Sequence, residues 1–246
     1  MAQYRWNVSE HAEGYDQAGP LIHPYYTEIQ EEVLRLLEGA GEPACVLDLG
    51  GGSGRLIERV LERFDQAMAI VLDQSEAFLG LAERRLARFA ERVTLVQARL
   101  QEDWAEQVPQ PIDAVVSMSA IHHLDASEKQ RLYRQAAEIL DDSGIFINGD
   151  EVRARDDDVY LGDLRAWAQH MEQLIADGRG PDPMAPVMQG WIERNVTNFG
   201  QPKVSGDDCH ETVEAQLDYL REAGLSTVEA TWQRELWAVL VGRKNG

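Results

Sequence analysis

Apolar residues along the chain alternate between short continuous runs and segments with a helical period. The runs cover 44–50, 67–73, 92–98, 112–120 and 145–149. Runs of this length are typical of strands that are buried on both faces of a sheet. Between two of them, apolar residues recur every three or four positions from Leu56 to Phe64, which predicts one buried helix face. Five strands joined by helices predict an α/β fold with a parallel, doubly wound sheet.

Polar residues predict where several of these elements begin and end. Ser75 can cap the helix that follows the second strand. Asp125 and Glu128, three positions apart, are typical of a capping box at the start of the helix that carries Leu132, Ala136, Ile139 and Leu140. A turn is expected at 142–144, just before the fifth strand. A helix from about Val213 precedes two further strands, 226–233 and 235–242, whose close connection predicts an antiparallel pair.

The alternation of strands and helices stops between 150 and 205. Two helices are expected there, at about 159–177 and 187–198, separated by a break rich in glycine and proline. We interpret this stretch as an insertion that covers one edge of the sheet. The predicted organisation is therefore an N-terminal helical cover (1–40), a core (41–149), a helical lid insertion (150–205) and a C-terminal helix with the strand pair that completes the core (206–246).

Composition narrows the class of protein. The 246 residues are 44% hydrophobic and 27% charged, which is the balance of an ordinary globular protein. No apolar run is long enough to cross a bilayer, and the first residues have neither the basic start nor the apolar core of a signal peptide. The only cysteines are Cys45, which falls within an apolar run, and Cys209. We therefore expect a soluble, cytoplasmic protein without disulfides.

The charge excludes some partners. Acidic residues outnumber basic ones 43 to 23, which gives a formal net charge of −20. Proteins that bind nucleic acids usually carry a basic face, and no cluster of lysines and arginines stands out along this sequence. We therefore expect a small-molecule substrate, with no DNA, large RNA or membrane as partner, and either a monomer or a homodimer.

The most informative segment is DLGGGSG at 48–54, between the first strand and its helix. Its glycines permit a tight turn and a close approach of the backbone to a ligand. In open parallel sheets, ligands bind at this edge. The spacing differs from the dinucleotide pattern G-x-G-x-x-G, because the third glycine would fall at Arg55. It resembles instead D-x-G-x-G-x-G, the first motif of class I S-adenosylmethionine-dependent methyltransferases.

Other segments add to this resemblance. Asp73 ends the second strand, where an acid can accept hydrogen bonds from a ribose diol. Residues 112–124 with the following GIFING resemble the fourth and fifth strands of the family, and 216–244 resembles its final helix and strand pair. The resemblance covers about 40–149 and 213–244 and is weak in between. It implies a seven-stranded Rossmann-like sheet whose last strand is antiparallel. It also implies in-line transfer of a methyl group from S-adenosylmethionine to a nitrogen or oxygen of a small molecule, with S-adenosylhomocysteine as product.

The resemblance further implies roles for individual residues toward the cofactor. Asp48 would bond toward the methionine amine, the glycines would pack on the methionine and sugar, and Asp73 would hold the ribose hydroxyls. Arg99 stands where many relatives have an aspartate that bonds the adenine amine. Because arginine has no acceptor, that amine needs another partner, such as Gln101, Glu102 or a carbonyl. The expected cofactor residues are Asp48, Gly50, Gly51, Gly52, Gly54, Asp73, Gln74, Arg99, Leu100 and Ser117.

Candidates for contact with the substrate come from several segments. Tyr15 and Asp16 resemble a pair that closes over the cofactor in relatives, and His122 and His123 follow the fourth strand. Asp150 and Glu151 leave the fifth strand, and His210 lies in a polar stretch that could belong to a lid. Each of these residues could instead have a purely structural role, in helix packing, in loop packing or in a solvated turn. The catalytic candidates are Tyr15, His122, His123, Glu151 and His210.

The insertion and its flanks leave two interpretations open. Its methionine and aromatic residues fit either a core or the wall of a hydrophobic substrate chamber; they are Tyr160, Trp167, Met171, Met184, Met188, Trp191 and Phe199. The acidic tracts at 156–158 and 207–211 contain possible metal ligands, but their spacing matches no known metal-binding loop. Acidic surface and helix starts explain both tracts, so no metal is expected.

Three other functions stay open. The chain could use S-adenosylmethionine for a reaction other than methyl transfer, or modify a tRNA nucleoside. It could bind the cofactor as a regulatory protein without turnover. Nicotinamide-dependent redox chemistry is disfavoured by the glycine spacing.

Overall fold

A seven-stranded sheet forms the centre of the computed structural model, which describes residues 7–109, 111–180 and 184–244. The strand order is β3-β2-β1-β4-β5-β7-β6. Neighbouring strands from β3 to β5 are parallel, and β7 is antiparallel to both β5 and β6. The predicted fold, a doubly wound sheet with its last strand antiparallel, is therefore confirmed. The strands are β1 (Cys45–Leu49), β2 (Met68–Asp73), β3 (Val93–Gln97), β4 (Ile112–Met118), β5 (Leu140–Glu151), β6 (Ser226–Arg234) and β7 (Trp237–Arg243).

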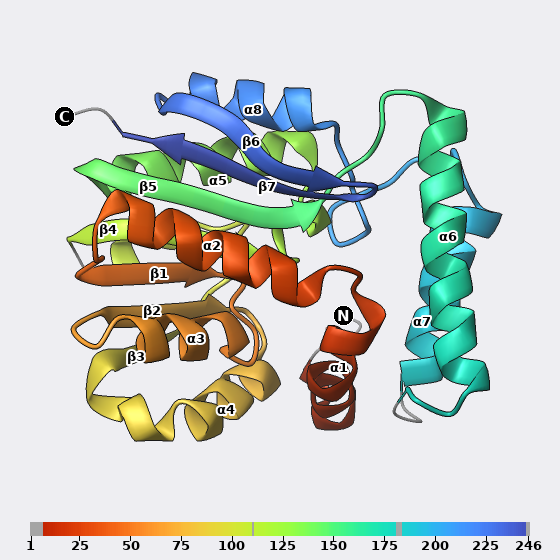
Figure 1. The fold of residues 1–246 in the computed structure, drawn as a ribbon, viewed down its shortest axis with the longest axis horizontal. Helices are drawn as coiled ribbons and strands as arrows, with labels where there is room; N and C mark the ends of the chain where they lie inside the picture. The colour runs from red at the N-terminus through yellow and green to blue at the C-terminus, as the bar shows by residue number, and fades with distance from the viewer. Residues whose placement is uncertain (1–6, 110, 181–183, 245–246) are drawn as a thin grey trace.

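Helices cover both faces of the sheet and one of its edges. α2, α3 and α4 lie on one face, α5 and α8 lie on the other, and α1, α6 and α7 stand beyond the carboxyl ends of the parallel strands (Figure 1). The helices are α1 (Ser9–Ile22), α2 (Tyr26–Ala40), α3 (Arg55–Arg63), α4 (Glu76–Arg85), α5 (Ala126–Ile139), α6 (Asp157–Ala176), α7 (Ala185–Ile192) and α8 (Val213–Glu222). Shorter helical turns are η2 (Ala87–Arg92), η3 (Ala105–Gln107), η4 (Ile121–His123) and η6 (Glu193–Thr197). None of the helices in the described ranges combines the length and the apolar character needed to cross a membrane.

Two hydrophobic cores flank the sheet and explain the continuous apolar runs. Successive side chains of a strand point to opposite faces. Val46 and Val71 therefore belong to the core beneath α2, α3 and α4, while their neighbours Leu47 and Leu72 belong to the core beneath α5 and α8. Since both faces are covered there, the central strands β1, β2, β4 and β7 are buried on both faces, whereas the edge strand β6 keeps exposed polar residues.

The predicted helix starts are confirmed in detail. The Ser75 side chain accepts a hydrogen bond from the Phe78 amide, and Asp125 and Glu128 form the reciprocal bonds of a capping box. The predicted turn at 142–144 is wrong, because β5 already begins at Leu140. Its register with β4 shifts between Leu140 and Ile145, so the intervening polar residues form an irregular extension of the strand.

The two segments predicted as covers, 1–40 and 150–205, lie differently relative to the sheet. Residues 150–205 include α6 and α7, and part of the predicted break between them, 181–183, lies outside the described residues. Within 1–40, α1 stands at the carboxyl edge of the sheet, whereas α2 packs on a sheet face (Figure 1). The apolar stripe of α2, with Ile29, Val33 and Leu37 buried, is the reason for this difference.

Candidate active site

A pocket lies at the carboxyl edge of β1, β2 and β4, between the sheet and the helices α1, α6 and α7. Its sheet side is formed by the loop after β1, by the ends of β2 and β4, and by the segment after β3. The residues on this side include Asp48, Gly50, Gly51, Gly52, Ser53, Asp73, Gln74, Leu100, Gln101, Ser119, His122, His123 and Glu151. This is the edge at which open parallel sheets bind ligands.

The loop after β1 has a shape that requires glycine. Gly50 and Gly52 have φ angles of 70° and 53°. A Cβ atom on Gly50 would lie 2.4 Å from the Ala120 Cβ, and one on Gly51 would lie 2.7 Å from an Asp48 oxygen. The loop therefore offers bare backbone to the pocket, as a cradle for a ligand does.

Two carboxylates flank this cradle. Asp48 Oδ1 is buried and has no hydrogen-bond partner among the described residues, and burial raises the pKa of Asp48 to about 8. Asp73 accepts hydrogen bonds from the Gly52 and Ser75 amides, at 3.0 and 2.8 Å. Burial raises the pKa of Asp73 to about 6. The cradle thus presents one buried acceptor without a partner among the described residues, Asp48 Oδ1, beside a carboxylate that backbone amides hold in place.

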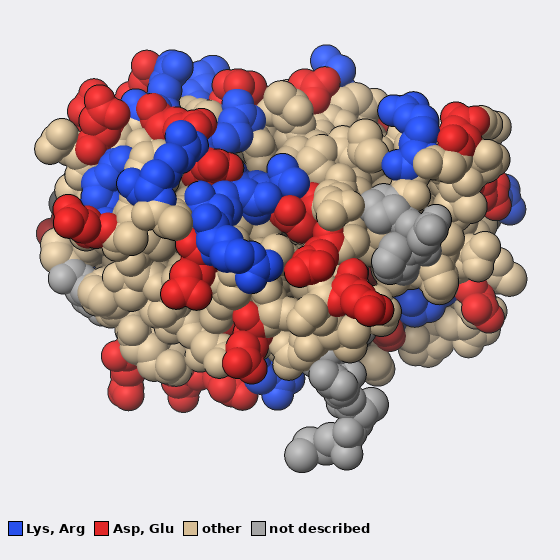
Figure 2. Space-filling model, turned by 90° about the horizontal axis from the view of Figure 1, so that it is seen from below, with Lys and Arg blue, Asp and Glu red and all other residues tan. Residues whose placement is uncertain are grey.

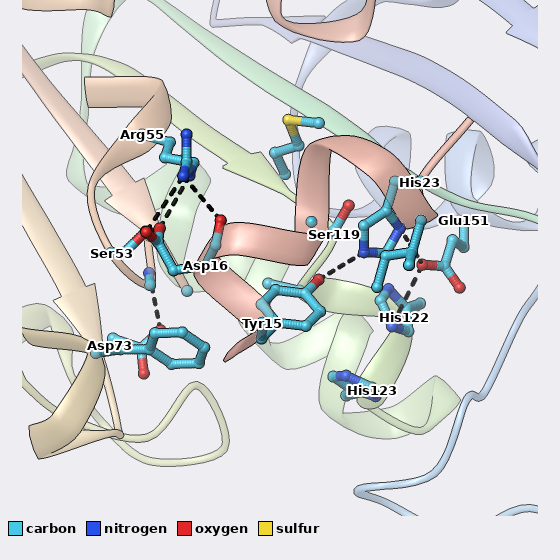
Figure 3. A pocket seen from close by; sticks show the side chains of 18 of the residues that line it. Tyr15, Asp16, His23, Ser53, Arg55, Asp73, Ser119, His122, His123 and Glu151 are labelled. Carbon is cyan, nitrogen blue, oxygen red and sulfur yellow. Dashed lines mark hydrogen bonds and ion pairs between the residues drawn. The ribbon is translucent and has the colours of Figure 1, made fainter. Parts of the chain in front are cut away.

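Asp16 ties α1 to the loop and to α4. Its carboxylate accepts hydrogen bonds from Arg55 Nε at 2.9 Å and from the Ser53 hydroxyl (Figure 3). It also accepts one from Arg85 Nη2 at 2.9 Å. Burial would raise the pKa of Asp16, but these donors, Arg85 foremost, lower it to about 2. The contacts hold the adjacent Tyr15 over the pocket, where its hydroxyl is hydrogen-bonded to His23 Nε2 at 2.7 Å.

Histidines and carboxylates gather at the other end of the pocket. His122 Nδ1 lies 2.7 Å from Asp150 Oδ1, and Asp150 also accepts hydrogen bonds from the backbone amides of His122 and Glu151. Glu151 is in turn hydrogen-bonded to His210 Nε2 at 2.9 Å. His23, His122 and Glu151 point toward one another in the pocket (Figure 3).

Burial shifts the titration of this group. It raises the pKa of Glu151 to about 8 and lowers the pKa of His210 to about 4 and that of His23 to about 3. Burial also lowers the pKa of His122, but the negative charges of Glu151 and Asp150 outweigh this, and the net shift is upward. At neutral pH, His23 and His210 are therefore uncharged.

The outer wall of the pocket is apolar. It is formed by residues of α6, α7 and the turn before α7, namely Trp167, Met171, Met184, Val187, Met188 and Trp191. The Trp167 Nε1–H donates to the Ile22 carbonyl at 2.6 Å, which connects α6 to α1. The methionine and aromatic stripe of the insertion is thus both core and chamber wall, except that Tyr160 and Phe199 line a separate, neighbouring pocket.

Four of the expected cofactor residues and catalytic candidates lie outside the pocket lining. Gly54 begins α3, where a Cβ would lie 2.9 Å from Leu86, so it serves packing against that side chain. Arg99 is exposed and lies 3.7 Å from Glu102. The buried Ser117 hydroxyl donates to the Leu49 carbonyl and joins β4 to β1. His210 stands behind Glu151.

The structure also adds residues that the sequence reasoning did not single out. His23, Ser119, Arg194 and Asp208 all line the pocket. Asp208 lies inside the acidic tract at 207–211, so its charge was a signal, but nothing in the sequence placed it beside His122. His23 lies at the end of α1, and only the packing of α1 on the sheet edge brings it to Glu151.

Comparison with known proteins places these features in a family. Residues 46–144 match a family model described as a methyltransferase domain. The malonyl-[acyl-carrier protein] O-methyltransferase of Geobacter sulfurreducens is 32% identical over 122 residues, which are 48% of this chain and 43% of the relative. A 23S rRNA (guanine(748)-N(1))-methyltransferase of Streptomyces fradiae is 43% identical over 75 residues, 29% of this chain and 25% of the relative. The chain therefore spans less than half the length of each of these two relatives.

Solved structures show the same fold over most of the chain. A putative S-adenosylmethionine-dependent methyltransferase from Methanococcus maripaludis has a TM-score of 0.63 at 15% identity, over 100% of this chain and 97% of its own. A putative O-methyltransferase from Nostoc punctiforme has a TM-score of 0.65 at 19% identity, over 95% of this chain and 59% of its own. The domain match covers β1 to β4, the glycine loop and Asp73, and the fold match extends the likeness to the whole sheet. Residues 46–144 therefore form a methyltransferase domain, and the chain as a whole has the Rossmann-like fold of the S-adenosylmethionine-dependent methyltransferases that it resembles.

Proposed function

We propose that this chain transfers a methyl group from S-adenosylmethionine to a nitrogen or oxygen atom of a small molecule. One observation carries the proposal: a single pocket joins the glycine cradle and Asp73 to an apolar chamber that ends in His122 and Glu151. The first part fits the cofactor and the second part fits an acceptor beside it.

The cradle suits the cofactor chemically. The unpartnered, buried Asp48 oxygen would accept a hydrogen bond from the ammonium group, and this cation would compensate the burial of the carboxylate. Asp73 would accept from the ribose diol, and the glycines at 50–52 leave room for the methionine and sugar. Leu100 and Phe78 offer apolar contacts for the adenine, with Gln74 beside them.

The bound cofactor supplies a methyl group already activated by its sulfonium. What remains for the protein is to orient the acceptor behind that carbon and to exclude water, which together can contribute several kcal/mol. Trp167, Trp191 and the methionines of the wall exclude water from the chamber. Tyr15, His122, His123 and Glu151 contact the acceptor in this proposal. His210 acts as a positioning residue through its hydrogen bond to Glu151.

An RNA substrate is the main alternative, because two relatives are named as rRNA methyltransferases. Contrary to the expectation from the sequence, arginines do gather on one face, among glutamates (Figure 2). Arginines of α3 and η2 are paired with glutamates: Arg59 with Glu31, Arg63 with Glu38, and Arg88 with Glu58 and Glu62. Since these pairs neutralise the arginines and the chain carries a net charge of −20, a small-molecule acceptor is favoured.

The test uses purified protein, methyl-labelled S-adenosylmethionine and two separate pools, a metabolite extract and total RNA. We expect S-adenosylhomocysteine and labelled product from the metabolite pool alone. Product from RNA alone would contradict the proposal. Cofactor binding without product from either pool would favour the regulatory alternative. Consumption of S-adenosylmethionine without formation of S-adenosylhomocysteine would favour another reaction of the same cofactor.

A further inference from the structure

A hydrogen-bonded chain of three side chains crosses the wall between the chamber and the neighbouring pocket. Glu151 lines the chamber, and its Oε2 is hydrogen-bonded to His210 Nε2 at 2.9 Å. His210 Nδ1 is in turn hydrogen-bonded to the Tyr160 hydroxyl at 2.7 Å. His210 and Tyr160 line the neighbouring pocket, whose lining includes the exposed side chain of Asp157. The chain therefore joins the acceptor end of the chamber to a pocket that reaches the surface.

The three links can be hydrogen-bonded in two ways, because a neutral histidine donates through one ring nitrogen and accepts through the other. In the first pattern, Glu151 Oε2–H donates to His210 Nε2, and His210 Nδ1–H donates to the Tyr160 oxygen. In the second pattern, the Tyr160 hydroxyl donates to Nδ1, and Nε2–H donates to Oε2. Each pattern satisfies both contacts. The first becomes the second when every proton moves one group outward.

Burial acts against a charge on any of the three groups. It raises the pKa of Glu151 to about 8, lowers the pKa of His210 to about 4 and raises the pKa of Tyr160. A proton therefore crosses most easily when each group gains one proton as it gives one away, so that none becomes charged. The other titratable or charged groups around the chain are His23, His122, Asp150 and Asp208 near Glu151, Lys129 and Lys203 near His210, and Arg153 and Asp157 near Tyr160.

The chamber side of the chain is placed to receive a proton. Glu151 Oε1 lies 3.8 Å from both His23 Nδ1 and His122 Nε2, which is too far for a hydrogen bond to either. An acceptor that enters as an O–H or N–H group loses that proton on methylation. The outer wall of the chamber is apolar and gives the proton no other group to move to.

We propose that Glu151, His210 and Tyr160 carry the acceptor's proton from the chamber to water in the neighbouring pocket. The acceptor atom forms its bond to the methyl carbon, the carbon–sulfur bond breaks, and its electron pair stays on sulfur. The acceptor's proton goes to Glu151 Oε1, the Oε2 proton to His210 Nε2, the Nδ1 proton to Tyr160, and the tyrosine proton to water. The positive charge of the sulfonium leaves with that last proton.

The chain returns to its first pattern after the product leaves. Glu151 Oε1 then gives its proton to water in the opened chamber, and a proton from the neighbouring pocket enters through Tyr160 and His210. The inference rests on the proposed methyl transfer. It narrows the acceptor to a hydroxyl or an N–H group that still carries its proton when it binds.

The first test needs no acceptor, because it follows the tautomer of His210 by nuclear magnetic resonance of labelled histidine nitrogens. The His210 signals are assigned by their loss in His210→Gln. Below about pH 8, Glu151 Oε2–H donates and the ring proton lies on Nδ1. Above that pH, the carboxylate accepts and the ring proton lies on Nε2. We expect this switch in the wild type and its absence in Glu151→Gln, and a wild-type tautomer that does not change across this range would overturn the inference.

The second test measures single-turnover formation of S-adenosylhomocysteine with one batch of metabolite extract as the source of acceptor. Tyr160→Phe removes the hydroxyl but keeps the ring, with its contacts to Phe199 and Arg153. We expect a roughly tenfold to hundredfold slower methyl transfer with unchanged affinity for S-adenosylmethionine. Tyr133→Phe is the matched control, because its buried hydroxyl makes a 2.7 Å hydrogen bond to Gln216 in the core beneath α5 and α8. It is expected to react at the wild-type rate.

His210→Gln separates proton transfer from the mere positioning of Glu151. Glutamine can still form a hydrogen bond to Glu151, but it cannot take a proton on one side and release one on the other. We expect a loss of rate as large as that of Tyr160→Phe, with folding of each variant checked by thermal unfolding. A wild-type rate in His210→Gln would overturn the relay and leave only a positioning role.

Two other outcomes would also overturn the inference. They are a wild-type rate in Tyr160→Phe and an equal loss of rate in Tyr133→Phe. Product from the wild type without the tautomer switch rejects the relay alone. A wild type that shows the switch but forms no product rejects the proposed function, while the exchange of a proton between Glu151 and His210 stands.

Discussion

At the scale of single residues, Asp73 and Asp16 show how position decides what a carboxylate does. Asp73 is bonded only by backbone amides, and its burial raises its pKa. Asp16 is surrounded by two arginines and a serine, and its pKa is lowered. The first is suited to an exchangeable ligand and the second to a permanent structural contact.

Asp73→Ala tests the ribose contact. Hydrogen bonds to a charged group contribute about 1.5–3 kcal/mol, so we expect a loss of affinity for S-adenosylmethionine of roughly tenfold or more, measured by calorimetry. Because the pKa of Asp73 in the free protein is about 6, the wild-type affinity should fall as the pH drops below 6 and the carboxylate is neutralised. The variant should lack this fall. Asp65→Ala, at an exposed site, is the control, and equal affinities in all three proteins would remove Asp73 from the role.

Asp16→Asn tests the connection of α1 to the loop. We expect a loss of about 1–3 kcal/mol in the free energy of unfolding at neutral pH, measured with urea. The folded pKa of about 2 lies below the ordinary 3.8, so the carboxylate stabilises the fold above about pH 4 and loses this effect as the pH falls toward 2. The difference between wild type and variant should therefore shrink in acid.

Glu13→Gln on the same helix is the matched control for Asp16. Its ion pair with Arg84 is exposed at 3.6 Å, so a change within about 0.5 kcal/mol is expected. A loss as large as that of Asp16→Asn would show that general charge removal from α1, and not the buried contact, is responsible.

At the scale of elements, the loop between β1 and α3 is set by backbone geometry. Gly50→Ala would place a methyl group 2.4 Å from Ala120 at a φ of 70°. We expect a loss of roughly 1–3 kcal/mol in stability or, if the loop shifts to relieve the clash, a loss of cofactor affinity. Thermal unfolding measures the stability, and calorimetry measures the affinity for the cofactor.

Gly39→Ala is the control for the loop. It lies in α2 with no atom within 4 Å of its added Cβ, and alanine there should stabilise the helix by about 0.5–1 kcal/mol. Tolerance of alanine at both positions would mean that the loop does not need its glycine.

At the scale of the whole molecule, α1, α6 and α7 form the cover of the pocket, and Asp16 anchors the α1 part of this cover to the loop after β1 and to α4. Two contacts of Trp167 hold the three helices of the cover together. Its indole donates to the Ile22 carbonyl at the end of α1, and its ring packs on Trp191 of α7 with ring centroids 4.3 Å apart. Because Asp16 anchors α1, we expect α6 and α7 to open more readily than α1, while the sheet and its back-face helices stay folded.

Hydrogen exchange with mass spectrometry tests this. Adding S-adenosylhomocysteine should slow exchange in α1, α6 and α7, because ligand binding stabilises the closed form, and should leave α8 unchanged. Uniform protection of cover and α8 alike would contradict a separately opening cover.

Local signals in the sequence determined the elements and the cofactor side of the site. Apolar runs predicted the strands because both faces of the sheet are covered. The motif at 48–54 and Asp73 follow adjacent parallel strands, so their proximity at the sheet edge was predictable too. The β5 start was missed because Asp141, Asp142 and Ser143 have the character of a turn, yet lie in an irregular extension of the strand that the register with β4 passes over. Arg99 and Ser117 were assigned by position in a motif, which does not determine the direction of a side chain.

Only the tertiary structure decided the acceptor side. His23, His122, Glu151 and Asp208 come from four segments far apart in the chain, and their meeting depends on how α1 and the segment before α8 pack over the sheet edge. Sequence spacing reports contacts within an element or between adjacent strand ends. Contacts made by packing of distant segments leave no such spacing, because they follow from shape and burial across the whole fold.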